Sequence, residues 1–377
     1  MDFDFSDEQT LIAESVGRLL GDAYAFEKRK VILASSQGYS EEVWAQLAEL
    51  GLLALPFSEE DGGIGGGPVE TMIVMETIGR TLALEPWFET AVLGGGVLRN
   101  AGSPEQRGEL IEEVAAGAMK LALATTERHS RYDLAQVETR AVRDGEGWRL
   151  SGAKGVVARG DVADRFVVSA RTAGGSGDEA GIGLFLVDPS AAGVTRRGYR
   201  MQDGRGACEL SLENVAVGPQ ALLGDPEAGH VALARVADEA IAALAAEAVG
   251  VMETMQALTL AYIKERKQFG RAIGDFQVLQ HRAAEMFVAL EQARSMAIYA
   301  ASMADEADAT ELRRAMAMTK VMIGQSGRLI GESAIQMHGG VGMTAEYAIG
   351  HYFKRMTMID IAFGDAGYHL QNLAEER

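Results

Sequence analysis

Residues 265–280 read ERKQFGRAIGDFQVLQ and interrupt a long helical region. The stretch opens with Arg266 and Lys267, reaches Phe269 and a flexible Gly270, and then resumes as a helix. Such residues suit a solvated basic helix end followed by a loop. They equally suit contact with an anionic, aromatic ligand. Segments elsewhere in the chain decide between the two interpretations.

Composition narrows the class of protein. At 377 residues, with 47% hydrophobic and 24% charged residues, the chain is typical of a soluble protein of two or three domains. Its formal net charge of −19 repels nucleic acids and anionic lipid surfaces, so we expect neither nucleic acid nor membrane as a partner. The single Cys208 favours a reducing compartment. Without a signal-peptide pattern or an uninterrupted apolar run of bilayer-spanning length, we expect a cytoplasmic protein.

The first third of the chain is predicted to be helical. Ser6 and Gln9 form a capping-box pattern. The stretch EEVWAQLAELGLLALPF, residues 41–57, continues the 3.6-residue period until the glycine-rich SEEDGGIGGG, which predicts a turn. Residues 71–102 predict two further helices, separated at Pro86.

The middle of the chain changes to short β-branched or alternating runs divided by Gly, Asp and Pro. The runs are MKLALATTE (119–127), VETRAVRDGEGWRLSGAKGVVARG (137–160), ADRFVVSAR (163–171), GIGLFLVDP (181–189) and CELSLENVAVG (208–218). DGEG, residues 144–147, predicts a hairpin turn, and residues 172–181 predict a flexible surface loop.

From about residue 225 long helical patterns rich in Ala, Leu, Val and Met return. The order of helices, strands and helices predicts an α+β fold rather than an alternating α/β sheet. We expect an N-terminal helical domain over 1–118, a central β-barrel or sandwich domain over 119–224, and a C-terminal four-helix bundle over 225–377. The sequence has no GxGxxG fingerprint, which disfavours a nicotinamide enzyme.

Five stretches, in this order, resemble the acyl-CoA dehydrogenase family. They are WAQLAELGLLALPFSEEDGGIGG (44–66), TTER (125–128), LSGAKGVVARGDVADRFVVSAR (150–171), RKQFG followed by FQVLQ (266–280), and QMHGGVGMTAEY (336–347). The resemblance covers essentially the whole chain. It implies FAD as cofactor, an acyl-CoA thioester as substrate, an electron-transfer flavoprotein-like acceptor, and an oligomer built as a dimer of dimers.

The resemblance also assigns residues to the cofactor. In the family, the Arg and Phe of R-x-x-F-G, the residue between them, and the Gln and glycines of Q-x-x-G-G contact the pyrophosphate and adenosine of a neighbouring subunit's FAD. The matching positions are Arg266, Gln268, Phe269, Gln336, Gly339 and Gly340. The resemblance also places Thr126 beside the subunit's own FAD. A guanidinium suits a diphosphate, and glycines let backbone approach the ligand.

The family's catalytic base is missing from its usual place. Desaturation of an acyl thioester requires a base for the α-proton and a flavin for the β-hydride. In most of the family the base is a Glu beyond the Gly-Gly stretch. Counting from Gly339 without gaps puts Phe363 there, and Phe cannot accept a proton. Asp365 is the nearest carboxylate, but it fits a turn residue after Gly364 better.

A minority of the family carries its base on the first long C-terminal helix. The matching position here is Ala240, ten residues before Gly250. Glu239 and Glu247 are the remaining candidates, although both fit solvated or salt-bridged helix residues better. The catalytic base therefore stays unknown.

The segments expected to face this chain's own flavin depart from the family as well. Tyr132 stands where a small Ser meets the pyrophosphate. Val156 replaces a Trp beside the isoalloxazine, and Ala158 replaces a Thr that donates near N5, a hydrogen bond worth about 0.5–1.5 kcal/mol. The residues offered to a neighbour's FAD are thus present, whereas those serving the chain's own FAD are replaced.

This division leads to one hypothesis and three competing ones. We expect this chain to be one subunit of a hetero-oligomeric acyl-CoA dehydrogenase and to complete the flavin site of a partner subunit. Because bacterial enzymes of this family that act on sterol side-chain thioesters are α2β2 assemblies, the resemblance suggests that substrate class. The competing hypotheses are a homotetramer with Glu239 or Glu247 as base, a flavin monooxygenase or oxidase on the same fold, and a structural subunit without ligand.

The histidines at 338, 351 and 369 match no tight metal-ligand spacing. We expect no metal site, and we expect these side chains to be packed or solvated.

Overall fold

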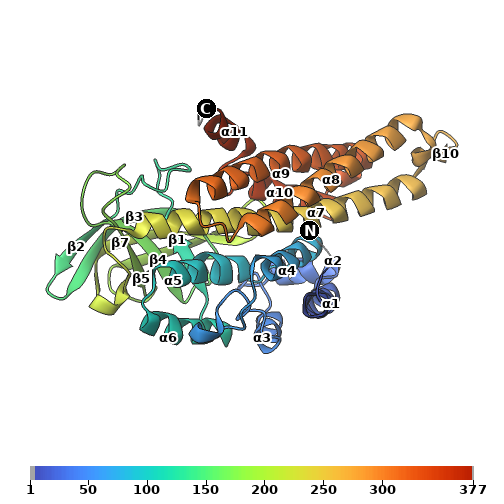
Figure 1. Ribbon diagram of the computed structural model, residues 1–377. Helices are drawn as coiled ribbons and strands as arrows, with labels where there is room; N and C mark the ends of the chain where they lie inside the picture. Colours follow the sequence, from blue (N-terminus) through green and yellow to red (C-terminus); the bar gives the residue numbers. More distant parts are fainter. Residues whose placement is uncertain (1–4, 376–377) are drawn as a thin grey trace. The chain divides into compact units, whose positions relative to one another are not determined.

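The computed structural model describes residues 5–375; residues 1–4 and 376–377, which end the first and third expected domains, lie outside the described part. Helices fill the chain up to Ala115, strands lie between Leu121 and Leu223, and helices follow from Gly229 (Figure 1). The structure confirms the α+β class and the predicted order of helical, sheet and helical segments.

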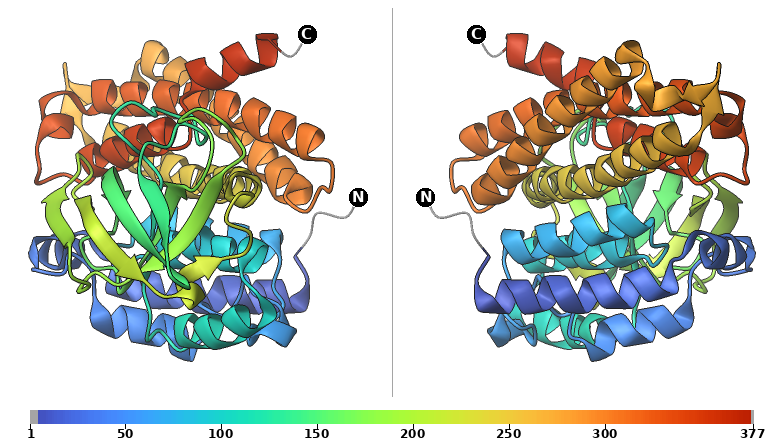
Figure 2. Two further views of the ribbon diagram at one scale, coloured as in Figure 1. Left: turned by 90° about the vertical axis from the view of Figure 1, so that its left-hand side faces the viewer. Right: turned by 90° about the vertical axis from the view of Figure 1, so that its right-hand side faces the viewer.

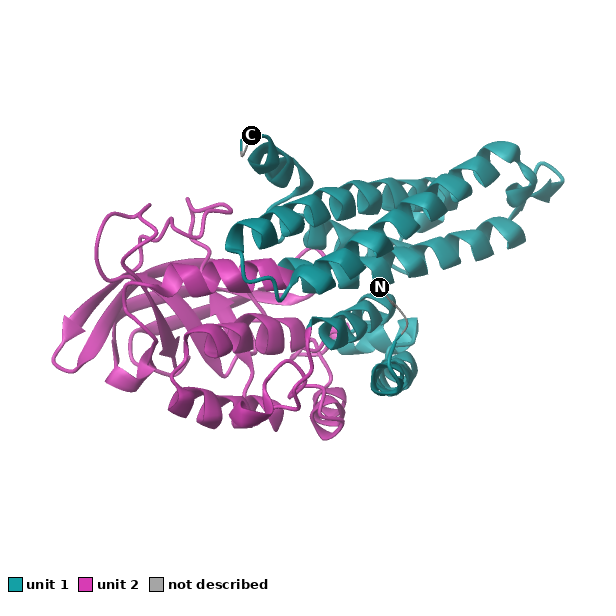
Figure 3. Cartoon of the chain, in the orientation of Figure 1, with its two compact units in different colours: residues 1–32, 68–83, 241–377 teal, residues 33–67, 84–240 magenta. Residues whose placement is uncertain are grey.

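The described chain forms two compact units (Figure 3). Unit 1 contains residues 1–32, 68–83 and 241–377, and unit 2 contains residues 33–67 and 84–240. The N-terminal helices are divided between the two units, because helices that are neighbours in the sequence pack with different parts of the chain. The three domain boundaries expected above stay a prediction.

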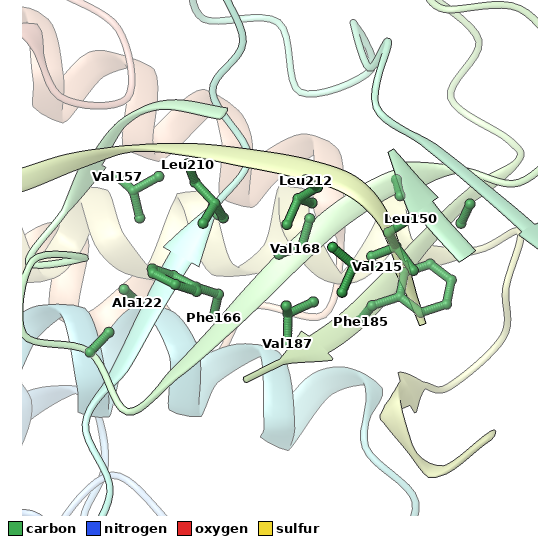
Figure 4. Packing of buried hydrophobic residues seen from close by; sticks show 14 of the residues in the cluster. Ala122, Leu150, Val157, Phe166, Val168, Phe185, Val187, Leu210, Leu212 and Val215 are labelled. Atoms are coloured by element: carbon green, nitrogen blue, oxygen red, sulfur yellow. The ribbon is translucent and has the colours of Figure 1, made fainter. Parts of the chain in front are cut away.

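Unit 2 contains one eight-stranded sheet, whose strands lie side by side as a twisted layer (Figure 2). The order along the sheet is β6-β7-β3-β2-β4-β5-β8, with β1 parallel to β4. The strands are β1 Leu121–Ala124, β2 Arg140–Asp144, β3 Gly147–Ala158, β4 Arg165–Arg171, β5 Ile182–Val187, β6 Val194–Arg200, β7 Gly206–Val217 and β8 Leu222–Leu223. Their inward side chains, including Phe166, Phe185 and Leu210, form a closed apolar core (Figure 4).

Local chemistry explains the connections between strands. Asp144 pairs with Gly147 across the β2–β3 turn, where Gly145 has φ +60°, which confirms the predicted hairpin. The loop over residues 172–181 is exposed, but Arg171 ties it down. The Arg171 guanidinium donates to the carbonyls of Asp178 and Ala180 at 2.8 and 2.7 Å. The guanidinium thus satisfies backbone carbonyls of the loop that have no partner strand.

Two details of unit 2 differ from the sequence prediction. Helix α3 covers only Glu41–Glu49, because Gly51 adopts φ +72° and the amide of Leu52 bonds back to the carbonyl of Leu47. The helix predicted to continue to residue 57 is therefore wrong beyond Glu49. Strand β6 was not predicted, since its exposed sequence VTRRGYR shows no apolar alternation and pairs with β7 alone.

Unit 2 also contains short helical elements and the start of a long helix, α7. They are the 3-10 helices η1 Glu59–Asp61 and η3 Pro219–Ala221, the π-helix η2 Phe88–Gly94, α5 Gly95–Ala101, α6 Pro104–Ala115 and the first turns of α7 Gly229–Glu265. The predicted break near Pro86 is confirmed, since α4 ends at Thr81 and η2 begins at Phe88. All seven residues of η2 are buried.

Unit 1 is helical. Its α-helices are α1 Asp7–Ala23, α2 Phe26–Ala34 (in unit 1 up to Ile32), α4 Pro68–Thr81, α7 Gly229–Glu265 (in unit 1 from Ile241 on), α8 Gln277–Met303, α9 Ala309–His338, α10 Ile349–Ile361 and α11 Ala366–Glu375. The capping box of Ser6 and Gln9 at the start of α1 is confirmed. Helices α4 and α7 approach closely: a Cβ on Gly79 would lie 2.0 Å from the Glu247 carbonyl oxygen, and one on Gly250 2.0 Å from that of Glu76.

Helix α7 is also long and apolar enough, by length and composition, to cross a bilayer, and it is the one helix of the described residues that passes this test. However, 78% of its most apolar 18-residue window is buried inside the chain. Such burial is typical of a core helix that is apolar all round.

Candidate functional site

Residues 266–276, here called the arm, form a tight hairpin after α7. Strands β9 Lys267–Gln268 and β10 Arg271–Ala272 pair antiparallel. The two turn residues, Phe269 and Gly270, have φ of +55° and +81°, as a type I′ turn requires. Figure 1 shows the hairpin where α7 ends and α8 begins. The stretch that the sequence predicts to be a flexible break is therefore a defined turn that presents Phe269 at its tip.

The tip of the arm carries an exposed aromatic ring. The side chain of Phe269 is 91% exposed, and its ring meets that of Phe276 edge-on at 6.2 Å. The Arg271 guanidinium lies 4.0 Å over the Phe276 ring. Arg266 and Gln268 are exposed beside it. These groups offer cationic donors and a flat apolar surface, which suit a nucleotide diphosphate.

Residues 339–347, here called the glycine loop, follow α9 and begin with the 3-10 helix η5 Gly339–Met343. Gly339 ends α9 with φ +62°. A Cβ added to Gly339 or Gly340 would meet no atom within 4 Å, whereas one on Gly342 would lie 3.0 Å from the Cβ of His338. Gly339 and Gly340 therefore border open space, in which a ligand can approach the backbone.

Tyr262 brings the arm and the glycine loop together within unit 1. Its carbonyl accepts the amide of Arg266 at 2.8 Å, and its hydroxyl donates to the carbonyl of His338 at 3.4 Å. Six of the seven expected cofactor residues thus gather at one end of the helical bundle. Sequence reasoning missed Tyr262; its place one turn before Arg266 was the available signal.

Thr126, the seventh residue, lies in unit 2 and is exposed after β1. Its carbonyl accepts the amide of Gly155 at 2.9 Å. The next residue, Val156, has φ +51° and is 54% exposed, at a bulge where the β3–β7 register shifts. Ala158 is half-buried. The two positions that the resemblance places beside a flavin ring therefore present apolar side chains without a donor.

A buried ion pair fixes the loop that precedes β2. Lys154 Nζ donates to Glu127 at 2.6 Å and to Ser169 at 3.0 Å. Glu127 also accepts the amides of Glu138 and Thr139. Burial by itself raises the pKa of Glu127, but Lys154 and the hydrogen bonds outweigh it and lower that pKa. Glu127 is therefore a structural carboxylate.

Within the same loop, Ser130 hydrogen-bonds the amide and the carbonyl of Glu127 at 2.9 and 3.0 Å. Arg131 follows in a left-handed conformation with φ +47°, and Tyr132 is half-buried. The loop is thus ordered by its own contacts around the large phenol ring.

Phe363, at the usual position of the base, packs on the bundle end of unit 1. It has φ +56° and contacts a buried cluster that includes Ala304 and Met316. His369 Nε2 binds the Phe363 carbonyl at 2.9 Å. Lys320 Nζ donates to the carbonyls of Ile359, Asp360 and Ala362, each at 2.8 Å, and so caps α10. The segment is held firmly and carries a ring in place of a carboxylate.

The remaining carboxylates near these positions have structural partners. Glu247 is fully buried and receives two bonds from Arg355, at 2.7 and 2.6 Å. Glu239 pairs with Arg99 at 2.5 Å and Arg235 at 3.2 Å. Asp365 accepts the amide of Tyr368 at 2.8 Å at the start of α11. Both oxygens of Glu247 and of Glu239 therefore accept from arginines, Asp365 accepts this amide through one oxygen, and Ala240 offers no carboxylate.

The exposed Arg266 and Phe269, with the open backbone at Gly340, offer a cationic donor, an apolar ring and accessible backbone, which together suit the diphosphate and adenosine of a flavin nucleotide. The described residues contain no group of three or more His, Cys, Asp or Glu side chains placed to hold a metal ion.

Comparisons with known proteins identify the family and the fold. The N-terminal, middle and C-terminal acyl-CoA dehydrogenase domain models match residues 6–118, 122–215 and 229–376. The probable acyl-CoA dehydrogenase YngJ of Bacillus subtilis is 27% identical over 97% of this chain and 96% of its own length.

Two solved assemblies are also similar. A structure of the Tcur3481-Tcur3483 steroid ACAD is 31% identical, covering 98% of this chain and 97% of that one, with a TM-score of 0.87. The ChsE4-ChsE5 complex from Mycobacterium tuberculosis is 26% identical over 100% and 98%, with a TM-score of 0.89. With three matched domains in order and these relatives along its whole length, the chain belongs to the acyl-CoA dehydrogenase family, whose members are FAD-dependent oxidoreductases.

Proposed function

We propose that this chain is one subunit of a hetero-oligomeric, FAD-dependent acyl-CoA dehydrogenase, in which it completes the flavin site of a related catalytic chain. One contrast carries the proposal. The groups that the family offers to a neighbour's flavin are present and exposed, led by Phe269 at 91% exposure. The groups that serve a subunit's own chemistry are replaced by Val156, Ala158 and Phe363.

FAD, when bound, supplies the acceptor for the hydride that leaves the β-carbon of the acyl thioester. In this proposal Arg266 and Gln268 bind the diphosphate of a flavin held mainly by the partner. Phe269 covers the adenosine, and the backbone at Gly339 and Gly340 closes the site. Gln336 borders the same surface. Thr126 stays the one expected contact to a flavin under this chain's own sheet.

The relatives support the choice of assembly and substrate class. Both similar assemblies carry two protein names, and one is described as a steroid ACAD. We therefore extend the proposal to a bulky acyl-CoA thioester, such as a sterol side chain, as the substrate of the complex. We also propose that a protein similar to electron-transfer flavoprotein accepts the electrons, and that the complex is cytoplasmic.

The test compares the lone chain with the chain co-expressed with its genomic neighbour. We expect the lone chain to lack stoichiometric flavin absorbance and dehydrogenase activity with an artificial electron acceptor. We expect the co-purified complex to have both. A lone chain that holds FAD and desaturates a thioester would refute the division of labour and restore Glu239 or Glu247 as candidates.

Two different results would indicate a different function. Oxygen consumption without an added acceptor would indicate an oxidase or monooxygenase. A partner that keeps its full flavin content without this chain would indicate a structural subunit.

A further inference from the structure

Two histidines bracket the glycine loop: His338 is the last residue of α9, and His351 lies in the first turn of α10. His338 is 3% exposed, and its Nδ1 lies 2.8 Å from the Ala334 carbonyl oxygen. A carbonyl only accepts, so Nδ1 carries the hydrogen. Nε2 then holds a lone pair, is enclosed, and has no hydrogen-bond partner among residues 5–375. The neutral imidazole fits this site, because a second hydrogen on Nε2 would meet no acceptor.

The His338 ring joins two segments of the candidate surface. It stacks on Tyr262 at 4.4 Å with an interplanar angle of 27°, and its centroid lies 5.1 Å from that of Tyr347. Tyr262 precedes the arm by one turn, and Tyr347 is the last residue of the glycine loop. The centroids of Tyr262 and Tyr347 are themselves 6.1 Å apart, so the imidazole is one of three mutually contacting rings that join the arm-bearing helix to the far end of the loop.

His351 holds the loop from its other side. Its Nε2 lies 3.0 Å from the carbonyl oxygen of Ala345, inside the glycine loop, so Nε2 carries the hydrogen. Its Nδ1 lies 3.4 Å from Arg29 Nη1, a donor, so Nδ1 accepts. The Phe26 ring contacts the imidazole edge-on at 5.1 Å. Both hydrogen-bonding neighbours thus select a neutral imidazole, with the tautomer opposite to that of His338.

We propose that His338 and His351, as neutral imidazoles, are positioning residues that hold the glycine loop in the shape that meets the flavin nucleotide. This inference rests on the proposed function for its consequence in the complex. The two histidines, here called the clasp, need no partner chain to hold the loop, because all their contacts lie within unit 1.

Charges around the clasp give it a pH dependence. Burial lowers the pKa of His338 despite its bond to Ala334, and Glu265 is the charged group that acts on the neighbouring Tyr347. Burial also lowers the pKa of His351, and the positive charges of Arg29, Lys354 and Lys30 add to that effect, against the bond to Ala345. As the pH falls, the unfolded chain therefore binds protons before the folded chain does. The clasp's contribution is complete above about pH 6.5 and declines as the pH falls below that value.

Hydrogen exchange on the full chain, without a partner, tests the clasp. After correction for intrinsic rates, we expect faster exchange of amides 340–348 at pH 5.5 than at pH 7.5, by up to roughly tenfold for each histidine that regains its ordinary pKa when the loop opens. The loop over residues 172–181, tied by Arg171, is the internal control and should not respond. Loop exchange independent of pH would overturn the proposal.

Matched variants separate the clasp from general packing. His351→Gln places a donor near the Ala345 carbonyl and an acceptor near Arg29 without a titrating group, so its loop should keep only the pH response of His338 and should respond less than that of the wild type. His351→Ala should open the loop at both pH values. For His338, His338→Asn keeps the donor at the Nδ1 position but loses ring stacking on Tyr262, and His338→Phe does the reverse; each should open the loop partially. Equal protection in His351→Ala and the wild type would refute the role.

The co-purified complex provides the second readout. We expect flavin content to fall between pH 7.5 and 5.5 in the wild type and to fall less in His351→Gln, which retains only His338. A loop that opens with acid while the complex keeps its flavin would overturn the positioning role. If the complex never holds flavin, the proposed function fails, and exchange on the lone chain still decides whether the histidines hold the loop.

Discussion

Substitution of the arm residues should separate flavin binding from folding. Phe269→Ala removes a ring that is 91% exposed, so the free energy of unfolding of the chain should change by no more than about 0.5 kcal/mol. The backbone strain at φ +55° is unchanged, because Phe and Ala both carry a Cβ. Any larger effect on the complex must then come from the ligand.

The magnitude follows from the contacts that the arm offers. Stacking of an aromatic side chain on a nucleotide base contributes about 1–3 kcal/mol. A hydrogen bond from a guanidinium to a phosphate contributes about 1.5–3 kcal/mol. Since about 1.4 kcal/mol corresponds to a factor of ten, Phe269→Ala and Arg266→Gln should each weaken FAD binding by the complex roughly 5- to 150-fold.

The assay is FAD dissociation from the co-purified complex, followed by flavin fluorescence, beside urea unfolding of the lone chain. Leu11→Ala is the control, because Leu11 lies on α1 and is 62% exposed without belonging to the arm. Unchanged FAD affinity in both arm variants would refute the reasoning. So would an equal loss of affinity in Leu11→Ala.

Three further predictions concern buried groups. Arg355→Met should destabilise the chain by about 3–5 kcal/mol in urea unfolding, because it leaves Glu247 charged and fully buried. Adding Glu247→Leu should recover most of the lost stability. An unchanged urea midpoint in Arg355→Met would show that the pair is not formed. Phe363→Glu should not confer dehydrogenase activity on the lone chain, because Val156 and Ala158 offer no donor at the positions expected beside this chain's own flavin. Measurable turnover would contradict this. Arg159→Met should leave the urea midpoint unchanged or raise it, since the Arg159 guanidinium is buried without a hydrogen-bond partner among the described residues; a loss above about 2 kcal/mol would reveal a partner.

Much of the fold could be predicted because apolar periodicity and glycine placement are local signals. Repeats at helical spacing located α4, α7, α8 and α9, and the glycine of DGEG located the β2–β3 hairpin. Predictions failed where tertiary contacts override local pattern. Helix α3 ends at Glu49 although apolar residues continue, because Gly51 turns the chain. Strand β6 is charged and exposed and is a strand only because β7 pairs with it.

Some features of the candidate site could be predicted from the sequence, and others could not. Exposure of Phe269 and the open space at Gly340 follow from a motif that the sequence displays. The pairing of Glu247 with Arg355 and of Glu239 with Arg99 could not be predicted, because these arginines are more than one hundred residues away in sequence; only Arg235, one helical turn before Glu239, is a local partner. The clasp could not be predicted for the same reason: Arg29, which hydrogen-bonds His351, and Tyr262, on which His338 stacks, lie outside the motif that contains His338.

The structure of this chain bound to its partner, with FAD, tests the central claim most directly. We expect the Arg266 guanidinium and the Phe269 ring to contact the diphosphate and adenosine of a flavin whose isoalloxazine lies in the partner polypeptide. A flavin seated under this chain's own sheet, with a carboxylate of this chain beside its thioester, would contradict that claim.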